Sequence, residues 1–170
     1  MIGISYIADA PIPSRAANCV QVLHMSSALA QTGCDVTLYA PWSSERLSGA
    51  AGAARLKEEF AIDHPVPIQY LPHASVAGRL FGTYFPVAAM AARWSPRRFV
   101  MTRNARIACL AADLGLDVIL ESHTPPNSPR LGKALNRLVH SPRLVLWVFI
   151  SARLRELFAG HIGKATPEVV

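Results

Sequence analysis

The sequence contains few cysteines, and their spacing suits neither a metal site nor a disulfide network. Its three cysteines, Cys19, Cys34 and Cys109, include no C-x-x-C pair. An odd number without ligand spacing is typical of small buried residues in a reducing compartment. The six histidines are also scattered without ligand spacing. We therefore expect neither a metal ion nor a cofactor.

The sequence also lacks a segment that could cross a membrane or direct secretion. Its longest clean apolar run, Leu144–Ile150, is far shorter than the ~20 residues that a membrane-spanning helix requires. The N-terminal stretch MIGISYIAD has no basic region and soon reaches an aspartate, which is typical of a first strand and not of a signal peptide. These absences favour a cytoplasmic protein.

Acidic residues are missing from two long stretches. None lies between His64 and Ala112, and none lies between Ser122 and Arg155. The whole chain has 17 basic and 11 acidic residues and a net charge of +6. Such a positive field favours phosphates, anionic lipid head groups or nucleic acid as partners. We expect no nucleic acid, because no known binding motif is present and few aromatic residues lie among the arginines.

Short apolar runs alternate with longer helical patterns, which is typical of a parallel α/β sheet. The predicted strands are Ile2–Ile7, Asp35–Ala40, Pro67–Leu71, Phe99–Thr102, Asp117–Glu121 and Leu144–Ile150, and Glu168–Val170 opens a seventh. No internal repeat or linker interrupts the 170 residues. The pattern predicts one Rossmann-like domain, a parallel sheet of about six or seven strands with helices on both faces.

Helical patterns fill the segments between these strands. The first predicted helix is capped by Ser14 and closed at Gly33, and the second ends near Phe60. The third and fourth cover Leu80–Trp94 and Ala105–Leu114. The fifth is opened by Ser128 and Pro129 and ends near His140, and the sixth is capped by Ser151 and runs to Phe158. Proline interrupts helices, so we expect a break or kink at Pro86.

Glycine-rich phosphate-binding loops are missing from this α/β pattern. No G-x-G-x-x-G, no P-loop and no G-x-S-x-G elbow is present, and no glycine lies between Gly3 and Gly33. The segment after the first strand instead offers Ser14, Arg15 and Asn18 at a helix N-terminus, which favours anions or sugar hydroxyls. The alternative is that Ser14 only caps the helix and Arg15 is solvated.

Polar residues follow several other predicted strands, where ligands of doubly wound sheets bind. Arg103 and Asn104 follow one strand and Ser151 follows another. Glu121 and His123 are two residues apart in extended chain, so their side chains share a face. The Glu121 carboxylate could then hold a ring N–H of His123 and fix its tautomer.

Three stretches of the sequence, in this order, resemble the N-terminal domain of family 4 (group 1) glycosyltransferases, which have the GT-B fold. The stretches are ISYIADAPIPSRAANCVQVLHMSSALAQTGCDVTLYAP, VMTRNARIACLAADLGLDVILESH and VFISARLRELF. In that family, a proline–serine turn leads to a helix ending in G-x-x-V-x-L. A "tRn" strand, an "lE-x-H" strand exit and an "IS-x-x-L" segment then follow.

The resemblance implies a retaining, metal-independent transfer of a sugar from a nucleotide-sugar donor to a glycan or lipid-linked acceptor, as in polysaccharide biosynthesis. His123 would approach the donor sugar as the catalytic residue, and Glu121 would orient it. The residues that would bind acceptor or donor are Ser14, Arg15, Asn18, Arg103, Asn104 and Ser151. Ser151 would either lie near the donor phosphates or cap a helix.

The resemblance also implies a division of labour between two domains. Residues 1–170 would be the N-terminal, acceptor-side domain, and the C-terminal donor-binding domain with its E-x₇-E motif would be absent, so that the chain alone is inactive. Many relatives carry a paired-glycine loop where this chain has Ser14, Arg15, Ala16 and Ala17. The alternative function is a non-catalytic acceptor- or membrane-docking subunit of a split glycosyltransferase.

Two basic helical patterns have both a surface and a core interpretation. Leu80–Trp94, with the nearby Arg93, Arg97 and Arg98, could rest on the anionic inner face of a membrane, or it could be an ordinary core helix. Arg130, Lys133 and Arg137 share one helical face, for which we expect solvent exposure.

Overall fold

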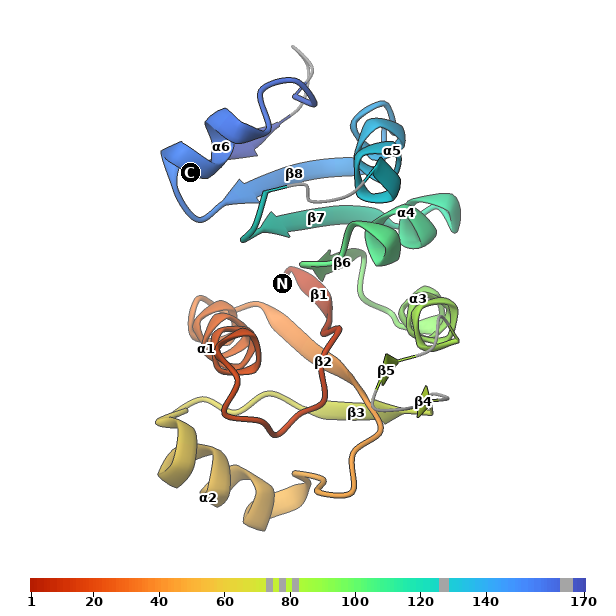
Figure 1. Cartoon of the computed structure of the whole chain (residues 1–170). Coiled ribbons are helices and arrows are strands. Elements are labelled where there is room, and N and C mark those ends of the chain that lie inside the picture. The colour runs from red at the N-terminus through yellow and green to blue at the C-terminus, as the bar shows by residue number, and fades with distance from the viewer. Residues whose placement is uncertain (73–74, 77–78, 81–82, 126–128, 163–166) are drawn as a thin grey trace.

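The protein forms one parallel sheet of seven strands (Figure 1). The computed structural model describes residues 1–72, 75–76, 79–80, 83–125, 129–162 and 167–170. The strands are β1 (Gly3–Ile7), β2 (Asp35–Pro41), β3 (Ile68–Leu71), β6 (Phe99–Thr102), β7 (Asp117–Ser122), β8 (Leu144–Phe149) and β9 (Glu168–Val169). Their spatial order is β3-β2-β1-β6-β7-β8-β9, and every neighbouring pair is parallel. The predicted fold class is confirmed.

Helices cover both faces of this sheet. The helices are α1 (Ala17–Gln31), α2 (Gly49–Phe60), α3 (Tyr84–Trp94), α4 (Ala105–Asp113), α5 (Pro129–Val139) and α6 (Ala152–Leu157). Figure 1 shows α1 and α2 on one side of the strands, and α3, α4 and α5 on the other. A parallel sheet needs such cover, because both of its faces are apolar.

The alternation of side chains along each strand divides the core into two layers. Tyr6 of β1 packs with Val22 of α1 and Leu56 of α2. Val118 and Leu120 of β7 pack in the other layer, with side chains from α3, α4 and α5. Ile119 and Glu121, which alternate with these two residues along β7, therefore face the α1 side of the sheet.

Two helix starts differ from the sequence prediction. The prediction that Ser14 caps the first helix is wrong, because α1 begins at Ala17 and the Ser14 hydroxyl only accepts a hydrogen bond from the Ala16 N–H (3.2 Å). The third helix begins at Tyr84, since Leu80 belongs to a short antiparallel pair of strands, β4 (Ser75–Val76) and β5 (Arg79–Leu80). Ser128, expected to open α5, lies outside the described residues.

The predicted interruption at Pro86 is also wrong. Pro86 is the third residue of α3, which runs without a break from Tyr84 to Trp94. Backbone N–H groups of a first helical turn have no partner within the helix, so a proline at this place removes no hydrogen bond. The position of the proline within the helix, which the sequence did not fix, decides its effect.

The amino-terminal edge of the sheet is held by ion pairs between arginines and the first residues of strands. The Asp117 carboxylate, which is buried at the start of β7, accepts hydrogen bonds from Arg98 Nε (2.8 Å) and from the Arg143 guanidinium (3.1 Å). Asp35 at the start of β2 pairs in the same way with Arg97 (2.7 Å). The arginines precede strands β6 and β8, so the Asp117 pairs link β7 to its two neighbours, and the Asp35 pair links β2 to the segment before β6, across β1.

We expect Asp117→Asn to destabilise the protein in a pH-dependent way. The hydrogen bond from Arg98, followed by that from Arg143, holds the pKa of the Asp117 carboxyl below its ordinary value. A lowered pKa in the folded state gives stability that is present at neutral pH and is lost as the pH falls below about 4. Urea unfolding should show a loss of about 1–3 kcal/mol at pH 7, and a smaller loss near pH 3. Asp63→Asn, at an exposed pair, is the control, and equal losses for Asp117→Asn at both pH values would contradict the assignment.

Candidate functional site

The direction in which the chain crosses the sheet reverses between β1 and β6. From β1 the chain proceeds through β2 to β3, whereas from β6 it proceeds the opposite way through β7 and β8. Ligands of open α/β sheets bind at such a switch point, beyond the carboxyl ends of the strands. Asp9 follows β1 there, and Arg103 and Asn104 follow β6.

The structure brings several of the predicted residues together at this switch point. The Arg103 guanidinium donates a hydrogen bond to the backbone carbonyl of Asn18 (3.2 Å), which lies in the first turn of α1. The Asn104 side-chain amide donates to Asp9 Oδ2 (3.2 Å). Arg103 and Asn104 therefore bridge the two strand exits, and Asp9 joins the predicted set.

Asn104 is also the N-cap of α4. Its side-chain oxygen accepts hydrogen bonds from the backbone N–H groups of Arg106 (3.0 Å) and Ile107 (3.4 Å). An N-cap of this kind stabilises a helix by about 1 kcal/mol. Since both ends of the Asn104 amide are occupied, Asn104 positions the groups around it.

Glu121 and His123 form the hydrogen-bonded pair that the sequence predicts. His123 Nε2 lies 2.5 Å from Glu121 Oε1 at the carboxyl end of β7. The Glu121 side chain is 4% exposed and the His123 side chain 11%. A carboxylate oxygen only accepts hydrogen bonds, so Nε2 carries the ring proton and Nδ1 is left to interact with a ligand.

Tyr6 is a third member of this cluster and was missed by sequence analysis. Its hydroxyl donates to Glu121 Oε2 (2.8 Å), and the side chain is fully buried in β1. Burial, and then the Glu121 carboxylate, raise the pKa of the Tyr6 hydroxyl well above its ordinary value, while the positive charge of Arg103 opposes the rise. Tyr6 thus occupies one oxygen of the Glu121 carboxylate and leaves the other to His123.

A small cavity of about 350 Å³ adjoins the Glu121–His123 pair. It lies between α1 and the ends of β7 and β8. Its lining residues are Gln21, His24, Met25, Ala28, Glu121, His123 and Ile150. Ile150 is 53% exposed although it follows a buried strand. The cavity therefore opens at the carboxyl edge of the sheet.

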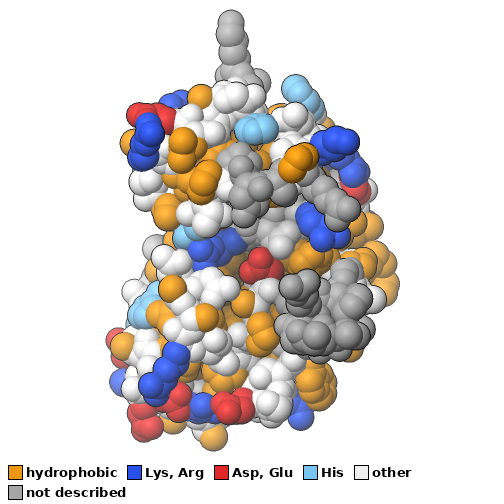
Figure 2. Space-filling view, viewed as in Figure 1, with side chains coloured by type: hydrophobic (Ala, Val, Ile, Leu, Met, Phe, Trp, Pro, Cys, Tyr) orange, Lys and Arg blue, Asp and Glu red, His pale blue; other side chains and the backbone are white. Residues whose placement is uncertain are grey.

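A larger hollow of about 830 Å³ begins at the switch point and runs between α4 and α5. We call it the α4–α5 groove. It is lined by Asp9, Arg103, Asn104, Ala105, Arg106, Cys109, Leu110, Asp113, Leu131, Lys133, Ala134 and Arg137. In Figure 2, basic side chains lie on both sides of an acidic one near the middle of the face in view. Arg103, Asn104 and Asp9 connect the groove to the other strand exits.

Other predicted site residues have structural contacts or lie apart from the switch point. The Asn18 side-chain oxygen accepts from the N–H of Cys19 (2.9 Å), so only its backbone meets Arg103. Arg15 is exposed, and its charge, after that of Arg55, lowers the pKa of Glu59 in α2. Ser151 is the N-cap of α6, and its hydroxyl accepts from the Leu154 N–H (3.2 Å).

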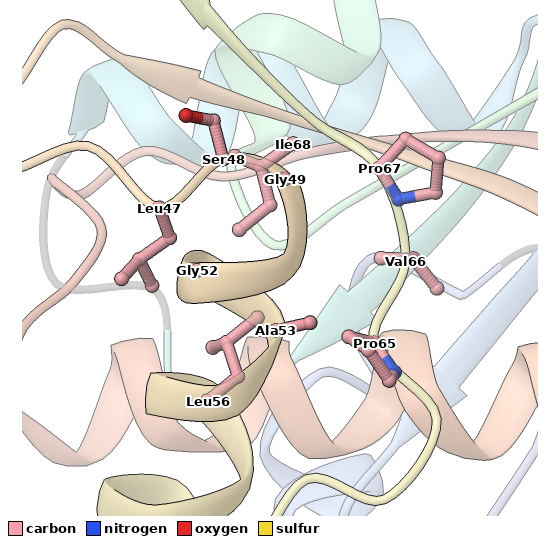
Figure 3. A pocket seen from close by; sticks show the side chains of 10 residues that line it. All are labelled: Leu47, Ser48, Gly49, Gly52, Ala53, Leu56, Pro65, Val66, Pro67 and Ile68. Carbon is pink, nitrogen blue, oxygen red and sulfur yellow. The ribbon is translucent and has the colours of Figure 1, made fainter.

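Another hollow lies between α2 and the segment that leads into β3 (Figure 3). Its volume is about 350 Å³, and its walls are Leu47, Ser48, Gly49, Gly52, Ala53, Leu56, Pro65, Val66, Pro67 and Ile68. The Ser48 hydroxyl is the one polar side-chain group in this set. Apolar walls near the edge strand, with no charged or titratable side chain, give this hollow no catalytic chemistry.

The described residues hold neither a metal-binding cluster nor a membrane-spanning helix. No group of three or more His, Cys, Asp or Glu side chains among them is arranged to hold a metal ion. No helix in the same part of the chain is long and apolar enough to cross a membrane.

Comparison with known proteins supports the fold. No protein-family model matches the sequence, and no curated protein matches it significantly. Among solved structures, the chain is similar to Anabaena Alr3699/HepE in complex with UDP and glucose, with a TM-score of 0.58 and 12% sequence identity. The match covers 100% of this chain and 44% of that one, so the chain spans less than half the length of that protein. The chain has a Rossmann-like α/β fold that matches one half of a GT-B fold, whereas membership of a glycosyltransferase family, family 4 included, stays a prediction.

We expect Tyr6→Phe to destabilise the protein more than Tyr84→Phe. Both hydroxyls are buried, but Tyr6 donates to a carboxylate, whereas Tyr84 donates to neutral backbone carbonyls, those of Ala8 (2.7 Å) and Tyr39 (3.2 Å). A hydrogen bond to a charged group is worth about 1.5–3 kcal/mol and one to a neutral group about 0.5–1.5 kcal/mol. Urea unfolding measures both losses, and ¹⁵N NMR of the His123 ring reports whether Nε2 stays protonated. A larger loss for Tyr84→Phe would contradict the role assigned to Tyr6.

Proposed function

We propose that the chain is the acceptor-binding half of a retaining glycosyltransferase, which moves a sugar from a nucleotide-sugar donor to a glycan or lipid-linked acceptor. The observation that carries the proposal is the buried Tyr6–Glu121–His123 cluster at a strand exit beside the switch point. The likeness to a protein crystallised with UDP and glucose supports the same class of donor. The order of the family 4 sequence features supports the assignment to that family.

In this function His123 interacts with the donor sugar through Nδ1, and Glu121 holds the ring in place. The fixed tautomer makes Nδ1 an acceptor for a sugar hydroxyl in the neutral ring, and a donor in the protonated ring. Arg103 supplies positive charge beside the cleft. Asn104 and Ser151 act through the helices that they cap. Ser14, Arg15 and Asn18 would meet the acceptor from the segment between β1 and α1, outside the residues that line the two hollows at the carboxyl edge.

The donor is held mainly by a second Rossmann-like half, and the chain is inactive without it. Two observations support this division. The β1 exit has no glycine with which the backbone could approach a diphosphate closely. The chain also matches less than half of the Anabaena protein. The second half is either part of the same polypeptide or, in a split transferase, a separate subunit that co-purifies with this chain.

We expect His123→Ala to lower kcat about 10²-fold in the presence of the donor-binding half, because one preorganised polar contact with the transition state is lost. Transfer is measured as release of UDP or GDP from nucleotide sugars in the presence of a lipid or glycan extract. His140→Ala, at an exposed position beyond α5, is the control and should leave kcat unchanged. Unchanged turnover in His123→Ala, or full turnover by this chain alone, would refute the proposal.

A peripheral membrane contact through α3 is a second part of the proposal. Val87, Met90 and Trp94 are exposed by 37%, 37% and 79%, and their spacing places them on one face of the helix. Arg93 lies beside them and is also exposed. An apolar stripe flanked by a basic side chain suits the surface of an anionic bilayer. Such a contact would bring a lipid-linked acceptor to the protein.

We expect Trp94→Ser to weaken sedimentation with anionic vesicles by about tenfold, since burial of an exposed tryptophan contributes about 1.5–3 kcal/mol. The matched control is Trp42→Ser, which removes an exposed tryptophan that stacks with Arg46 (4.2 Å from the ring centroid). Equal binding of the parent protein to neutral and anionic vesicles, or equal losses in the two variants, would exclude an electrostatic contact through α3.

A further inference from the structure

The α4–α5 groove carries more positive than negative charge. Four cationic side chains line it, those of Arg103, Arg106, Lys133 and Arg137, whereas its carboxylates are those of Asp9 and Asp113. At the far end Arg137 forms an ion pair with Asp113, so these two charges offset each other. The remaining cations lie nearer to the switch point and exceed the remaining carboxylate by two.

These remaining cations are available to a ligand. Among the described residues, no carboxylate forms an ion pair with Arg106 or Lys133, and both side chains are exposed. The Arg106 guanidinium lies over the Phe85 ring (5.3 Å), which orients it without neutralising it. Arg103 is fixed by one hydrogen bond to the Asn18 carbonyl. Cations held in place without a carboxylate partner suit a ligand with phosphate oxygens.

The Asp9 carboxylate, at the end of the groove nearest the switch point, is also held in place. Asp9 accepts a hydrogen bond from the Asn104 amide through Oδ2, and Asn104 is itself held as the cap of α4. A phosphate would avoid this carboxylate, but a sugar hydroxyl would donate to it. The end of the groove at the switch point therefore suits a ligand with two different groups, a hydroxyl that binds Asp9 and a phosphate that lies toward Arg106 and Lys133.

The groove also has an apolar wall. Its contributors are Cys109, Leu110, Leu131 and Ala134. Sequence analysis treated the face of α5 that carries Lys133 and Arg137 as an ordinary solvated surface. In the structure Lys133 and Arg137 are solvent-exposed, as predicted, and they also border the groove between α5 and α4, so that these cations lie beside a concave surface with carbon atoms in it.

We propose that the α4–α5 groove binds the phosphate group of a phosphate-bearing acceptor. The acceptor is thus a sugar phosphate or a prenyl-linked phosphate, and not a neutral glycan. That the ligand is an acceptor rests on the proposed function, whereas the phosphate-binding site itself rests on the charges and shape of the groove. No bond is made or broken in the groove, whose role is to hold the acceptor with a hydroxyl directed at the switch point.

Calorimetry with soluble ligands tests the proposal. The probes are geranyl phosphate against geraniol, glucose 1-phosphate against glucose, and inorganic phosphate alone. We expect at least one phosphate ester to bind about tenfold or more tightly than its phosphate-free counterpart, since the phosphate gains charge-assisted hydrogen bonds from the cations of the groove. Preference for geranyl phosphate identifies a lipid-linked acceptor, and preference for glucose 1-phosphate a phosphorylated sugar.

Variants at the groove separate this site from general attraction to a basic protein. Arg106→Gln combined with Lys133→Gln should remove the preference for the phosphate ester, while Lys57→Gln combined with Arg153→Gln, at exposed positions outside the groove, should keep it. Thermal unfolding shows whether the variants remain folded. Equal binding with and without phosphate, or equal losses in both double variants, would overturn the proposal.

The outcome is independent of the test of the proposed function, because binding requires neither donor nor turnover. A chain that binds phosphate esters in the groove, but whose His123→Ala variant transfers sugar normally, would keep the site and lose the catalytic role. A chain with a catalytic His123 and no preference for phosphate would lose the groove as a phosphate site.

Discussion

The buried carboxylate of Glu121 is the constraint on which the candidate site depends. An ionised carboxylate in a protein interior is costly unless donors satisfy both of its oxygens. Tyr6 satisfies one and His123 the other. Because Tyr6 belongs to β1 and Glu121 to β7, with β6 between them, the pair can form only when the central strands are in register. Correct assembly of the sheet therefore also places the Glu121 carboxylate that orients the His123 ring.

The amino-terminal and carboxyl edges of the sheet differ in how fully their charged side chains are paired. At the amino-terminal edge, Asp117 pairs with arginines from the segments before the two neighbouring strands, and Asp35 pairs with an arginine from the segment before β6, across β1. These pairs stabilise the sheet. At the carboxyl edge, Arg106 and Lys133 lie beside a groove without such matching. The carboxyl edge has a pair of its own in Glu121 and His123. Among the described residues, however, Arg106 and Lys133 have no carboxylate partner, which leaves positive charge near the switch point, where ligands of this fold class bind.

Much of the fold could be predicted from the sequence, because buried parallel strands are continuous apolar runs and the helices between them have a different period. The Glu121–His123 pair followed from the same alternation along a strand. Tyr6 did not, since its partner lies 115 residues away and only the strand order brings them together. The start of α1 and the effect of Pro86 also escaped prediction, because both depend on a helix boundary that tertiary contacts shift by a few residues.

The capping residues show why polar strand exits are an incomplete guide to function. Asn104 and Ser151 both follow strands, as ligand-binding residues of this fold class do, yet each uses its side-chain oxygen to cap the next helix. In a βα unit the strand exit and the helix N-cap are neighbouring positions, so the same residue types suit both roles. What distinguishes Arg103 and His123 is that neither caps a helix. Each is held by one contact, to Asn18 and to Glu121 respectively, and each retains a polar group with which to bind a ligand.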